Sequence, residues 1–378
     1  MKPAESRPIK DYCLGIFDGP HATPKESHDG PVFLGIKNIT EDGQLDLSEI
    51  RHVSEDEYPR WTRRVTPQPG DVVFTYEATL HRYAIIPDGF RGCLGRRVAL
   101  VRPDPGRADS RYLLYFFLSR NWRNVVESSV ITGATVDRVP LERFPSFPAA
   151  LPRLDVQQQI AGVLSAYDDL IENNRRRMAL LEESARQLYR EWFVRLRFPG
   201  HEHTRITNGV PERWERVPLG NRVTLNYGKA LKAEDRAAGP CPVYGSSGIV
   251  GMHERALAAA PGIVVGRKGN VGSVYWCPRD YWPIDTVYFI DAETSNMWLF
   301  YALWHMHFIS TDVAVPGLNR DFAYSRPLLV PEPHIIRDFL ETAVPLHEQI
   351  ARLDEMKQRL RAARDLLLPR LMSGEIAV

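Results

Sequence analysis

Basic and amide side chains lie between glycines in one short stretch of the chain, GRKGNVG at residues 266–272. Arg267 and Lys268 carry cations of the kind that bind phosphates, and Asn270 carries an amide that can hydrogen-bond a base edge. We therefore interpret this loop as a candidate nucleic-acid contact; the alternative is a hairpin turn with solvated charges. The candidate contacts of the second half are Ser246, Ser247, Arg267, Lys268, Asn270, Asn319 and Arg320.

The first half offers weaker candidates of the same chemistry in a polar loop, DGPHATPK, and in the turns that follow two expected strands. Arg96 and Arg97 adjoin on an expected strand, so at most one of them faces a ligand. Solvated surface charge is the alternative for every member of this set. Its members are His21, Thr23, Lys25, Tyr76, Thr79, Arg82, Arg96 and Arg97.

The sequence contains none of the catalytic or metal-binding motifs that we considered. The chain has no Pro-Pro dipeptide of the kind that amino-methyltransferases use, and YGKAL lacks the upstream Gly and the Ser/Thr of a phosphate-binding loop. The four cysteines form no CxxC, and the pairs His201/His203 and His305/His307 have no matching Cys or acidic cluster. We expect no catalytic residue, no metal and no cofactor in this chain.

Length and composition indicate an ordinary globular protein of two or three domains. The 378 residues are 44% hydrophobic and 25% charged, with no apolar run long enough to span a membrane and no secretory leader, so we expect a cytoplasmic location and no membrane partner. The net charge of only +1 means that basic groups must be concentrated on one face if the partner is DNA.

A long helix is expected from Leu154 to Phe193, because this stretch contains no Pro and its apolar positions alternate in steps of four and three. This spacing is typical of a coiled coil, in which a buried Asn174 fixes the register; a long core helix is the alternative. The principal seam positions are Ile160, Leu164, Tyr167, Ile171, Asn174, Met178, Leu181 and Leu188.

A second, shorter helix is expected to begin at Pro345, to end near Pro369 and to pair with the first. Its seam positions are Ile350, Leu353, Leu360 and Leu367. The predicted fold class is α+β, with two similar mixed domains separated by two long antiparallel helices and an internal pseudo-two-fold. The expected segments are residues 1–150 and 198–343 for the domains, and 151–197 and 344–378 for the helices.

Four landmarks recur in the same order in the two halves, which indicates an internal duplication. VVFTYEATLHRYAIIP at residues 72–87 matches IVVGRKGNVGSVYWCP at residues 263–278, and YLLYFFLS at 112–119 matches MWLFYALW at 297–304. Gly133 matches Gly317, and the Gln-Ile-Ala triplet at 159–161 matches that at 349–351. A duplicated chain presents two similar surfaces, as a dimer does on two DNA half-sites.

The sequence resembles the specificity subunits of type I restriction-modification systems over nearly its whole length. The resemblance rests on DGPHATPKESHDGPVFLGIKNIT, PERWERVPLG, PVYGSSGIVGMHE, IVVGRKGNVGSVYW, LLLPRLMSGEI and the helix from Gln157 to Phe193. It implies two target recognition domains that read the halves of a bipartite, asymmetric site in double-stranded DNA, with the helices as a ruler. One departure is that Gly266, Gly269 and Gly272 face no glycine in TYEATLH at 75–81, so the two loops need not contact DNA alike.

The resemblance also implies partners. Two modification subunits would carry S-adenosylmethionine and methylate adenine, and motor-nuclease restriction subunits would use ATP and Mg. This chain would supply DNA recognition and no catalysis.

Three other functions remain open at the level of sequence. A self-contained restriction endonuclease would cleave plasmid DNA with magnesium alone, and a coiled-coil adaptor would not respond to DNA. GRKG also resembles the GxxG loop of RNA-binding KH domains, although the surrounding helix pattern differs from that module.

Overall fold

The computed structural model describes residues 5–25, 27–132, 136–309 and 317–378. Contacts divide the chain into two compact units, residues 1–174 with 356–378, and residues 175–355. Each unit holds one sheet-bearing domain and part of both long helices, so each half of a helix packs into the core of its own unit. The expected boundaries at residues 150 and 198 were placed between helix and domain. The contacts instead divide the chain within the two long helices, after residues 174 and 355.

The described part of the first unit contains two larger sheets and the two-stranded pair of β1 and β9. A four-stranded antiparallel sheet has the order β2–β8–β5–β6, and a three-stranded sheet has the order β4–β3–β7 with β3 and β7 parallel. The strands are β1 (Arg7–Pro8), β2 (Cys13–Asp18), β3 (Ser27–Leu34), β4 (Arg51–His52), β5 (Val72–Thr75), β6 (Tyr83–Ile85), β7 (Gly92–Leu94), β8 (Val98–Pro103) and β9 (Pro148–Ala149). The short helices are α1 (Tyr58–Trp61), α2 (Ser110–Leu118) and α3 (Arg120–Glu127), with 3-10 turns η1 (Ile9–Tyr12), η2 (Ile36–Asn38) and η3 (Phe144–Ser146).

The second unit repeats the topology of both larger sheets and has a two-stranded pair of β12 and β20 where the first has β1 and β9, whereas its β10–β11 hairpin has no counterpart among the described strands of the first. Its four-stranded sheet has the order β13–β19–β16–β17, and its three-stranded sheet has the order β15–β14–β18 with β14 and β18 parallel. The strands are β10 (Ile206–Thr207), β11 (Val210–Pro211), β12 (Glu215–Pro218), β13 (Asn226–Tyr227), β14 (Cys241–Gly245), β15 (Gly248–His253), β16 (Gly262–Gly266), β17 (Val274–Cys277), β18 (Trp282–Pro283), β19 (Val287–Ile290) and β20 (Pro327–Val330). The helices are α5 (Met297–His305) and α6 (Arg320–Ser325), with 3-10 turns η5 (His201–His203), η6 (Leu219–Asn221) and η7 (Ala233–Asp235).

The register of the repeated hairpin agrees with the duplication expected at residues 72–87 and 263–278. Val72 faces Ile85 in the β5–β6 pair, and Ile263 faces Trp276 in the β16–β17 pair, so the two ladders coincide when residue numbers are shifted by 191. The helix match needs a shift of two residues. Asp109 caps α2 at Tyr112, and Asn296 caps α5 at Leu299, so Tyr112 corresponds to Leu299 and not to Met297.

Gly133, expected to correspond to Gly317, lies outside the described residues. The described part of the first unit places another residue in that role. The backbone of Glu77 bridges Arg138, as the backbone of Lys268 bridges Gly317, so Arg138 is the structural counterpart of Gly317.

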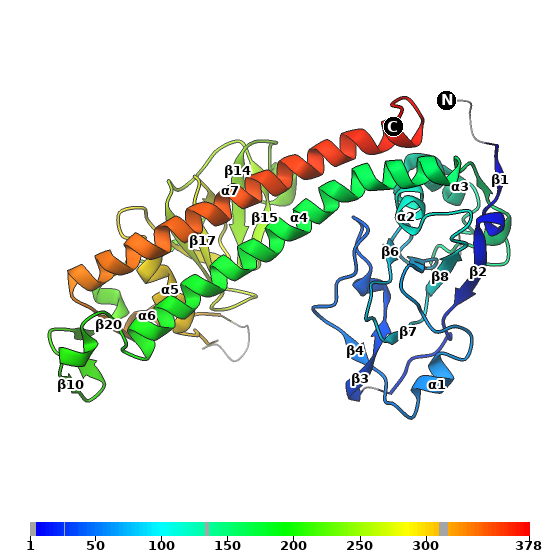
Figure 1. The fold of residues 1–378 in the computed structure, drawn as a ribbon. Coiled ribbons are helices and arrows are strands. Elements are labelled where there is room, and N and C mark those ends of the chain that lie inside the picture. Colours follow the sequence, from blue (N-terminus) through cyan, green and yellow to red (C-terminus); the bar gives the residue numbers. More distant parts are fainter. Residues whose placement is uncertain (1–4, 26, 133–135, 310–316) are drawn as a thin grey trace. The chain divides into compact units, whose positions relative to one another are not determined.

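The first long helix, α4, runs from Leu154 to Tyr189 over 36 residues and continues into a π-helical turn, η4 (Arg190–Val194). It is the long green helix of Figure 1. All eight expected seam residues are buried or half-buried, and Asn174 is only 3% exposed. The burial of these side chains therefore agrees with the expected seam, because all of them lie on one face of the helix.

The second long helix, α7, differs from expectation at both ends. It runs from Pro333 to Met372 over 40 residues, so it begins twelve residues before Pro345 and continues past Pro369. A proline inside a helix costs one backbone hydrogen bond. Here the buried side chains of Ile335, Phe339 and Ala343, spaced four apart in the core of the second unit, hold the turns before Pro345. The second helix is thus longer than the first, although a shorter one was expected.

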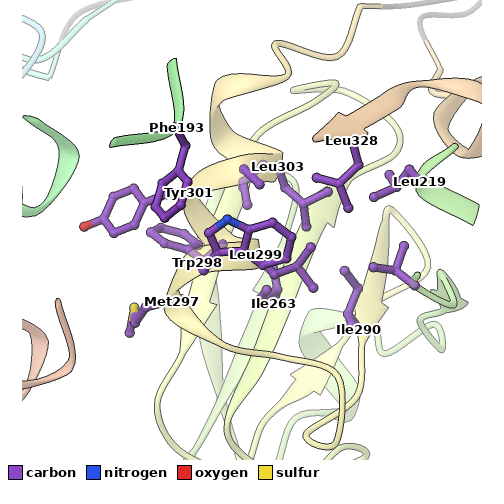
Figure 2. Close-up of a cluster of buried hydrophobic side chains, with 14 of the residues drawn as sticks. Phe193, Leu219, Ile263, Ile290, Met297, Trp298, Leu299, Tyr301, Leu303 and Leu328 are labelled. Carbon is purple, nitrogen blue, oxygen red and sulfur yellow. The ribbon is translucent and has the colours of Figure 1, made fainter. Parts of the chain in front are cut away.

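The hydrophobic core of each unit includes residues of both long helices. In the first unit Ile160 and Leu164 of α4 and Leu371 of α7 join the cluster built around α2. In the second unit Figure 2 shows Trp298, Leu299 and Leu303 of α5 among Ile263 and Ile290 of the sheet. Ala185 and Phe339 belong to the same cluster. The helices run antiparallel within each unit, since later residues of α4 meet earlier residues of α7.

The polar junction between domain and helices differs between the units. In the first, the Tyr115 hydroxyl of α2 donates to Asp168 of α4 at 2.5 Å, and Arg364 of α7 donates to the other carboxylate oxygen at 2.5 Å. In the second, Tyr301 of α5 lies 2.7 Å from Nε2 of His347 of α7. Within the described residues, no helix is long and apolar enough to cross a membrane.

Candidate nucleic-acid interface

The loop between β16 and β17 is held from below by one buried serine. Ser246 Oγ accepts from the backbone N–H of Asn270 at 3.3 Å, and the hydroxyl of Ser273 donates to the Ser246 carbonyl at 2.6 Å. Ser246 was expected to contact DNA, but it is 9% exposed and serves the loop instead. Its neighbour Ser247 is exposed, as are Lys268 and Asn270 at the tip.

Arg267 is fixed by aromatic rings and by backbone bonds. Its guanidinium lies 5.0 Å from the ring centre of Tyr227 and 5.7 Å from that of Tyr288, and its Nη1 donates to the Asp285 carbonyl at 3.2 Å. Its own carbonyl accepts from the N–H of Leu318 at 2.8 Å. This last bond brings the segment from Gly317 onward next to the loop, so residues 50 apart in sequence share one surface.

Arg320 contacts the same Tyr227 ring. Its guanidinium is 5.0 Å from the ring centre of Tyr227 and 5.9 Å from that of Tyr324. Burial and the neighbouring Tyr227 raise the pKa of Tyr288, so its hydroxyl is protonated and donates to the Leu318 carbonyl at 3.0 Å. The residues around these groups line a pocket of about 230 Å³: Tyr227, Arg267, Lys268, Tyr288, Gly317, Leu318, Asn319, Arg320 and Asp321.

Asn319 has a structural role that the sequence did not indicate. It is the N-cap of α6, and its Oδ1 accepts from the N–H groups of Asp321 at 2.8 Å and Phe322 at 3.1 Å. The cap occupies the oxygen that a base-reading amide would need. Of the expected Asn319–Arg320 pair, Arg320 therefore remains the better candidate for a ligand contact.

The equivalent surface of the first domain is built from different groups. The β2–β8 and β13–β19 ladders place Asp18 where Tyr227 stands, and the β5–β6 hairpin places Tyr76 where Arg267 stands. Nε2 of His21 is 3.1 Å from Asp18 Oδ2 and 3.3 Å from the Tyr76 hydroxyl, and Arg64 donates to Asp18 Oδ1 at 2.6 Å. Burial raises the pKa of Tyr76 to about 12, so this hydroxyl stays protonated.

The other expected contacts of the first domain divide into exposed and internally bonded groups. Thr23, Lys25 and Arg96 are exposed, and Thr79 is half-buried. Arg82 donates to the Ile39 carbonyl at 3.3 Å and to Glu41 at 3.4 Å.

Arg96 and Arg97 lie in a turn rather than in a strand, because β8 begins only at Val98. Arg97 has a left-handed backbone with φ of 70° and forms an ion pair with Glu77 at 3.0 Å. Strand alternation therefore does not explain their orientation. Arg96 is nevertheless the member of the pair that is exposed.

Asp18, Arg64, Tyr227 and Tyr288 belong to these two surfaces but were missed from sequence. A signal was available in FDG at residues 17–19 and NYG at 226–228, each at the end of the outer strand. A Cβ on Gly19 would lie 2.6 Å from the Gly95 carbonyl oxygen, and one on Gly228 would lie 2.1 Å from that of Ile284. Both positions need glycine. An alignment of Gly19 with Gly228 would have placed Asp18 opposite Tyr227. Within the described ranges, no group of three or more His, Cys, Asp or Glu residues is placed to hold a metal ion.

The repeated fold and the two differing surfaces match a known class of protein. A family model, the type I restriction modification DNA specificity domain, matches residues 49–183, and the chain is similar to type I restriction-modification specificity subunits. It is 23% identical to the specificity subunit of the type I restriction enzyme MjaIX of Methanocaldococcus jannaschii, over 99% of this chain and 90% of that relative. A putative MjaX specificity subunit of the same organism is 25% identical over 57% of this chain and 52% of its own length.

A solved structure supports the fold independently. The S subunit of the type I restriction-modification system from M. genitalium superposes with a TM-score of 0.57 and 16% identity, over 97% of this chain and 95% of that one. At this level of identity the likeness concerns the fold alone. The α+β fold class expected from the sequence is therefore confirmed. The expected resemblance to type I specificity subunits agrees with the family model and with the sequence relatives.

Proposed function

We propose that this chain is a DNA sequence-specificity subunit in which each sheet-bearing domain reads one half of a bipartite, asymmetric site in double-stranded DNA. The observation that supports this most strongly is the repetition of the topology of both larger sheets with different side chains at equivalent positions. Where the first domain has Asp18 and Tyr76, the second has Tyr227 and Arg267. The same framework with different recognition groups is what two unlike half-sites require.

The net charge of +1 does not oppose DNA binding, because basic groups gather at the loop surface of the second domain. Arg267, Lys268 and Arg320 line one pocket there. Lys268 is exposed and suits a phosphate contact, whereas the two guanidiniums that contact the Tyr227 ring suit planar acceptors.

As a specificity subunit, the chain acts in a complex with DNA and with other subunits. We place two modification subunits on the paired helices, α4 and α7, and S-adenosylmethionine in those subunits. Restriction subunits would bring ATP and Mg, and this chain itself would carry no catalytic group and no cofactor. The complex would act in the cytoplasm and have no membrane partner. In this proposal the length of the helices sets the spacing between the half-sites.

Adenine methylation in a host cell tests the proposal. The chain is expressed together with the methyltransferase encoded beside it, and methylated adenines are mapped by single-molecule sequencing. A bipartite, asymmetric motif should appear only when this chain is present. A matched control is the same host with the methyltransferase alone.

A removal of 13 residues, Glu172 to Ser184, tests the ruler. The shortened helix should change the spacing between half-sites or abolish methylation. Retention of the same spacer length in the methylated motif would contradict the role of the helices in setting the spacing. A methylation pattern that is the same with and without this chain would contradict the proposed specificity function.

A further inference from the structure

We infer that Arg320 reads a guanine in the half-site of the second domain, and that Tyr227 and Arg267 hold it in position. This assignment rests on the proposed function and adds the base that this domain recognises. It begins from one feature of the cluster, namely that two guanidiniums lie at the same distance of 5.0 Å from one tyrosine ring.

The two arginines are used differently by the fold. Arg267 donates from Nη1 to the Asp285 carbonyl at 3.2 Å and contacts two rings, so it is committed to the domain. Arg320 contacts the rings of Tyr227 and Tyr324, and its guanidinium makes no hydrogen bond or ion pair with another residue in the described part of the chain. It is half-exposed and lines the 230 Å³ pocket. Its donors are therefore available to a ligand.

Ring contacts determine what such a guanidinium binds well. Contact with Tyr227 and Tyr324 restricts the plane of the fork, and Tyr227 is itself held by Arg267 on its ring. A guanidinium fixed in one plane suits a pair of hydrogen-bond acceptors that lie in the same plane. Guanine presents O6 and N7 side by side in the major groove, and arginine is its commonest bidentate partner, whereas adenine presents a donor beside N7.

A phosphate also accepts a bidentate arginine, but the pocket offers a second cation for that task. Lys268 is exposed at the loop tip and is a flexible point charge, which suits a phosphate in any orientation. The assignment is limited to one half-site, because the first domain has Asp18 at the position of Tyr227. Asp18 has no aromatic ring to hold a guanidinium, and its carboxylate already accepts from Arg64.

The test uses the complex of this chain with its methyltransferase and the DNA site recovered by methylation mapping. Each guanine of the second-domain half-site is replaced in turn by 7-deazaguanine, which removes the N7 acceptor and keeps base pairing. Wild-type complex should lose roughly tenfold in affinity at one position. Arg320→Lys should weaken binding of unmodified DNA by a similar factor and should no longer respond to 7-deazaguanine at that position.

Two further variants separate recognition from folding. Tyr227→Leu should keep the cations but reduce the preference for guanine at that position, because the fork is no longer held in plane. Arg326→Ala is the matched control, since Arg326 contacts the Phe322 ring at 5.7 Å outside the pocket. It should leave the 7-deazaguanine response intact, and the thermal unfolding of all variants should stay close to that of wild type.

Several results would overturn the assignment. One is a second-domain half-site without guanine on either strand. Another is an Arg320→Ala complex that loses affinity equally for every DNA sequence and keeps the 7-deazaguanine penalty, which would make Arg320 a phosphate contact. Both leave the proposed function standing. A wild-type complex that binds all DNA sequences equally would instead contradict the proposed function together with this assignment.

Discussion

The β5–β6 loop and the β16–β17 loop share one backbone path and differ in almost every side chain. Ala78 and His81 have left-handed φ values of 69° and 63°, and the residues at the same places in the second loop are Gly269 and Gly272, with φ values of 77° and 76°. Glycine adopts this conformation freely, while other L-residues pay about 1 kcal/mol or more. The path is therefore set by the strand register and not by the glycines.

Side chains at this shared backbone give the two domains different electrostatic character. Glu77 of the first loop pairs with Arg97 at 3.0 Å, whereas its counterpart Lys268 is exposed. Asp18 and Tyr76 meet a histidine in the first domain, while Tyr227 supports two guanidiniums in the second. A duplicated framework thus keeps its backbone hydrogen bonds while the exposed groups diverge.

Substitution of the glycine that follows the outer strand should give the largest effect. A Cβ at Gly228 would lie 2.1 Å from the Ile284 carbonyl oxygen, and one at Gly19 would lie 2.6 Å from that of Gly95. Gly228→Ala should lower the free energy of unfolding of the second unit by about 3 kcal/mol, and Gly19→Ala should act likewise on the first. Urea denaturation measures both.

The control for these variants is Gly162→Ala, because a Cβ at Gly162 in α4 meets nothing within 4 Å. It should stabilise the protein by up to about 1 kcal/mol through helix propensity. A free energy of unfolding for Gly228→Ala within experimental error of wild type would show that the close approach of Gly228 to the Ile284 carbonyl is not required.

Acid should affect the junction of the second unit, where His347 contacts Tyr301. Burial lowers the pKa of His347 to about 4, against about 6.5 in an unfolded chain. Between these values the unfolded chain binds a proton that the folded one does not, so stability falls as pH drops from about 6.5 to 4. The expected loss is about 2 kcal/mol, after allowance for partial contact with solvent.

Unfolding measured at several pH values tests this prediction, and His347→Gln should remove the slope between pH 6.5 and 4. The first unit has no histidine at its Tyr115–Asp168–Arg364 junction. An undiminished slope in the His347→Gln variant would assign the effect to another group.

Removal of one charge at either loop tip should change the free energy of DNA binding by about 1 kcal/mol. Lys268→Ala should weaken binding of all DNA sequences alike and reduce the salt dependence by about one phosphate contact. Glu77→Ala should strengthen binding slightly, because it frees Arg97 and removes a negative charge. Affinities over a range of salt concentrations measure both, and a sequence-dependent effect of Lys268→Ala would assign it to a base contact.

The smallest effects should have opposite signs at two equivalent positions. Ala78→Gly should stabilise the first domain by about 0.5 to 1 kcal/mol, because glycine relieves the left-handed strain at an exposed site. Gly269→Ala should destabilise the second by about 1 kcal/mol, since its Cβ would also lie 3.1 Å from Ser246 Oγ. Thermal unfolding of the pair tests whether the loops share their backbone, and shifts of equal sign would contradict it.

Sequence periodicity was sufficient for the first long helix and for the repeated hairpin. The seam from Ile160 to Leu188 and the ladder offset of 191 both depend on local spacing, which a chain carries in its residue order. Pro345 misled the same reasoning for the second helix. The core contacts of Ile335 and Phe339 outweigh the hydrogen bond that a proline removes, and such long-range contacts cannot be read from a helix rule.

The candidate site divides along the same line. By itself the sequence determined the duplication, the family resemblance and the basic loop at Arg267 and Lys268, because each depends on residue types in a fixed order. Only the tertiary structure decided that Ser246 and Asn319 support the backbone, and that Tyr227 lies against both Arg267 and Arg320. Those roles follow from strand pairing between distant segments, since a side chain binds a ligand only where the fold has not already used its donors and acceptors.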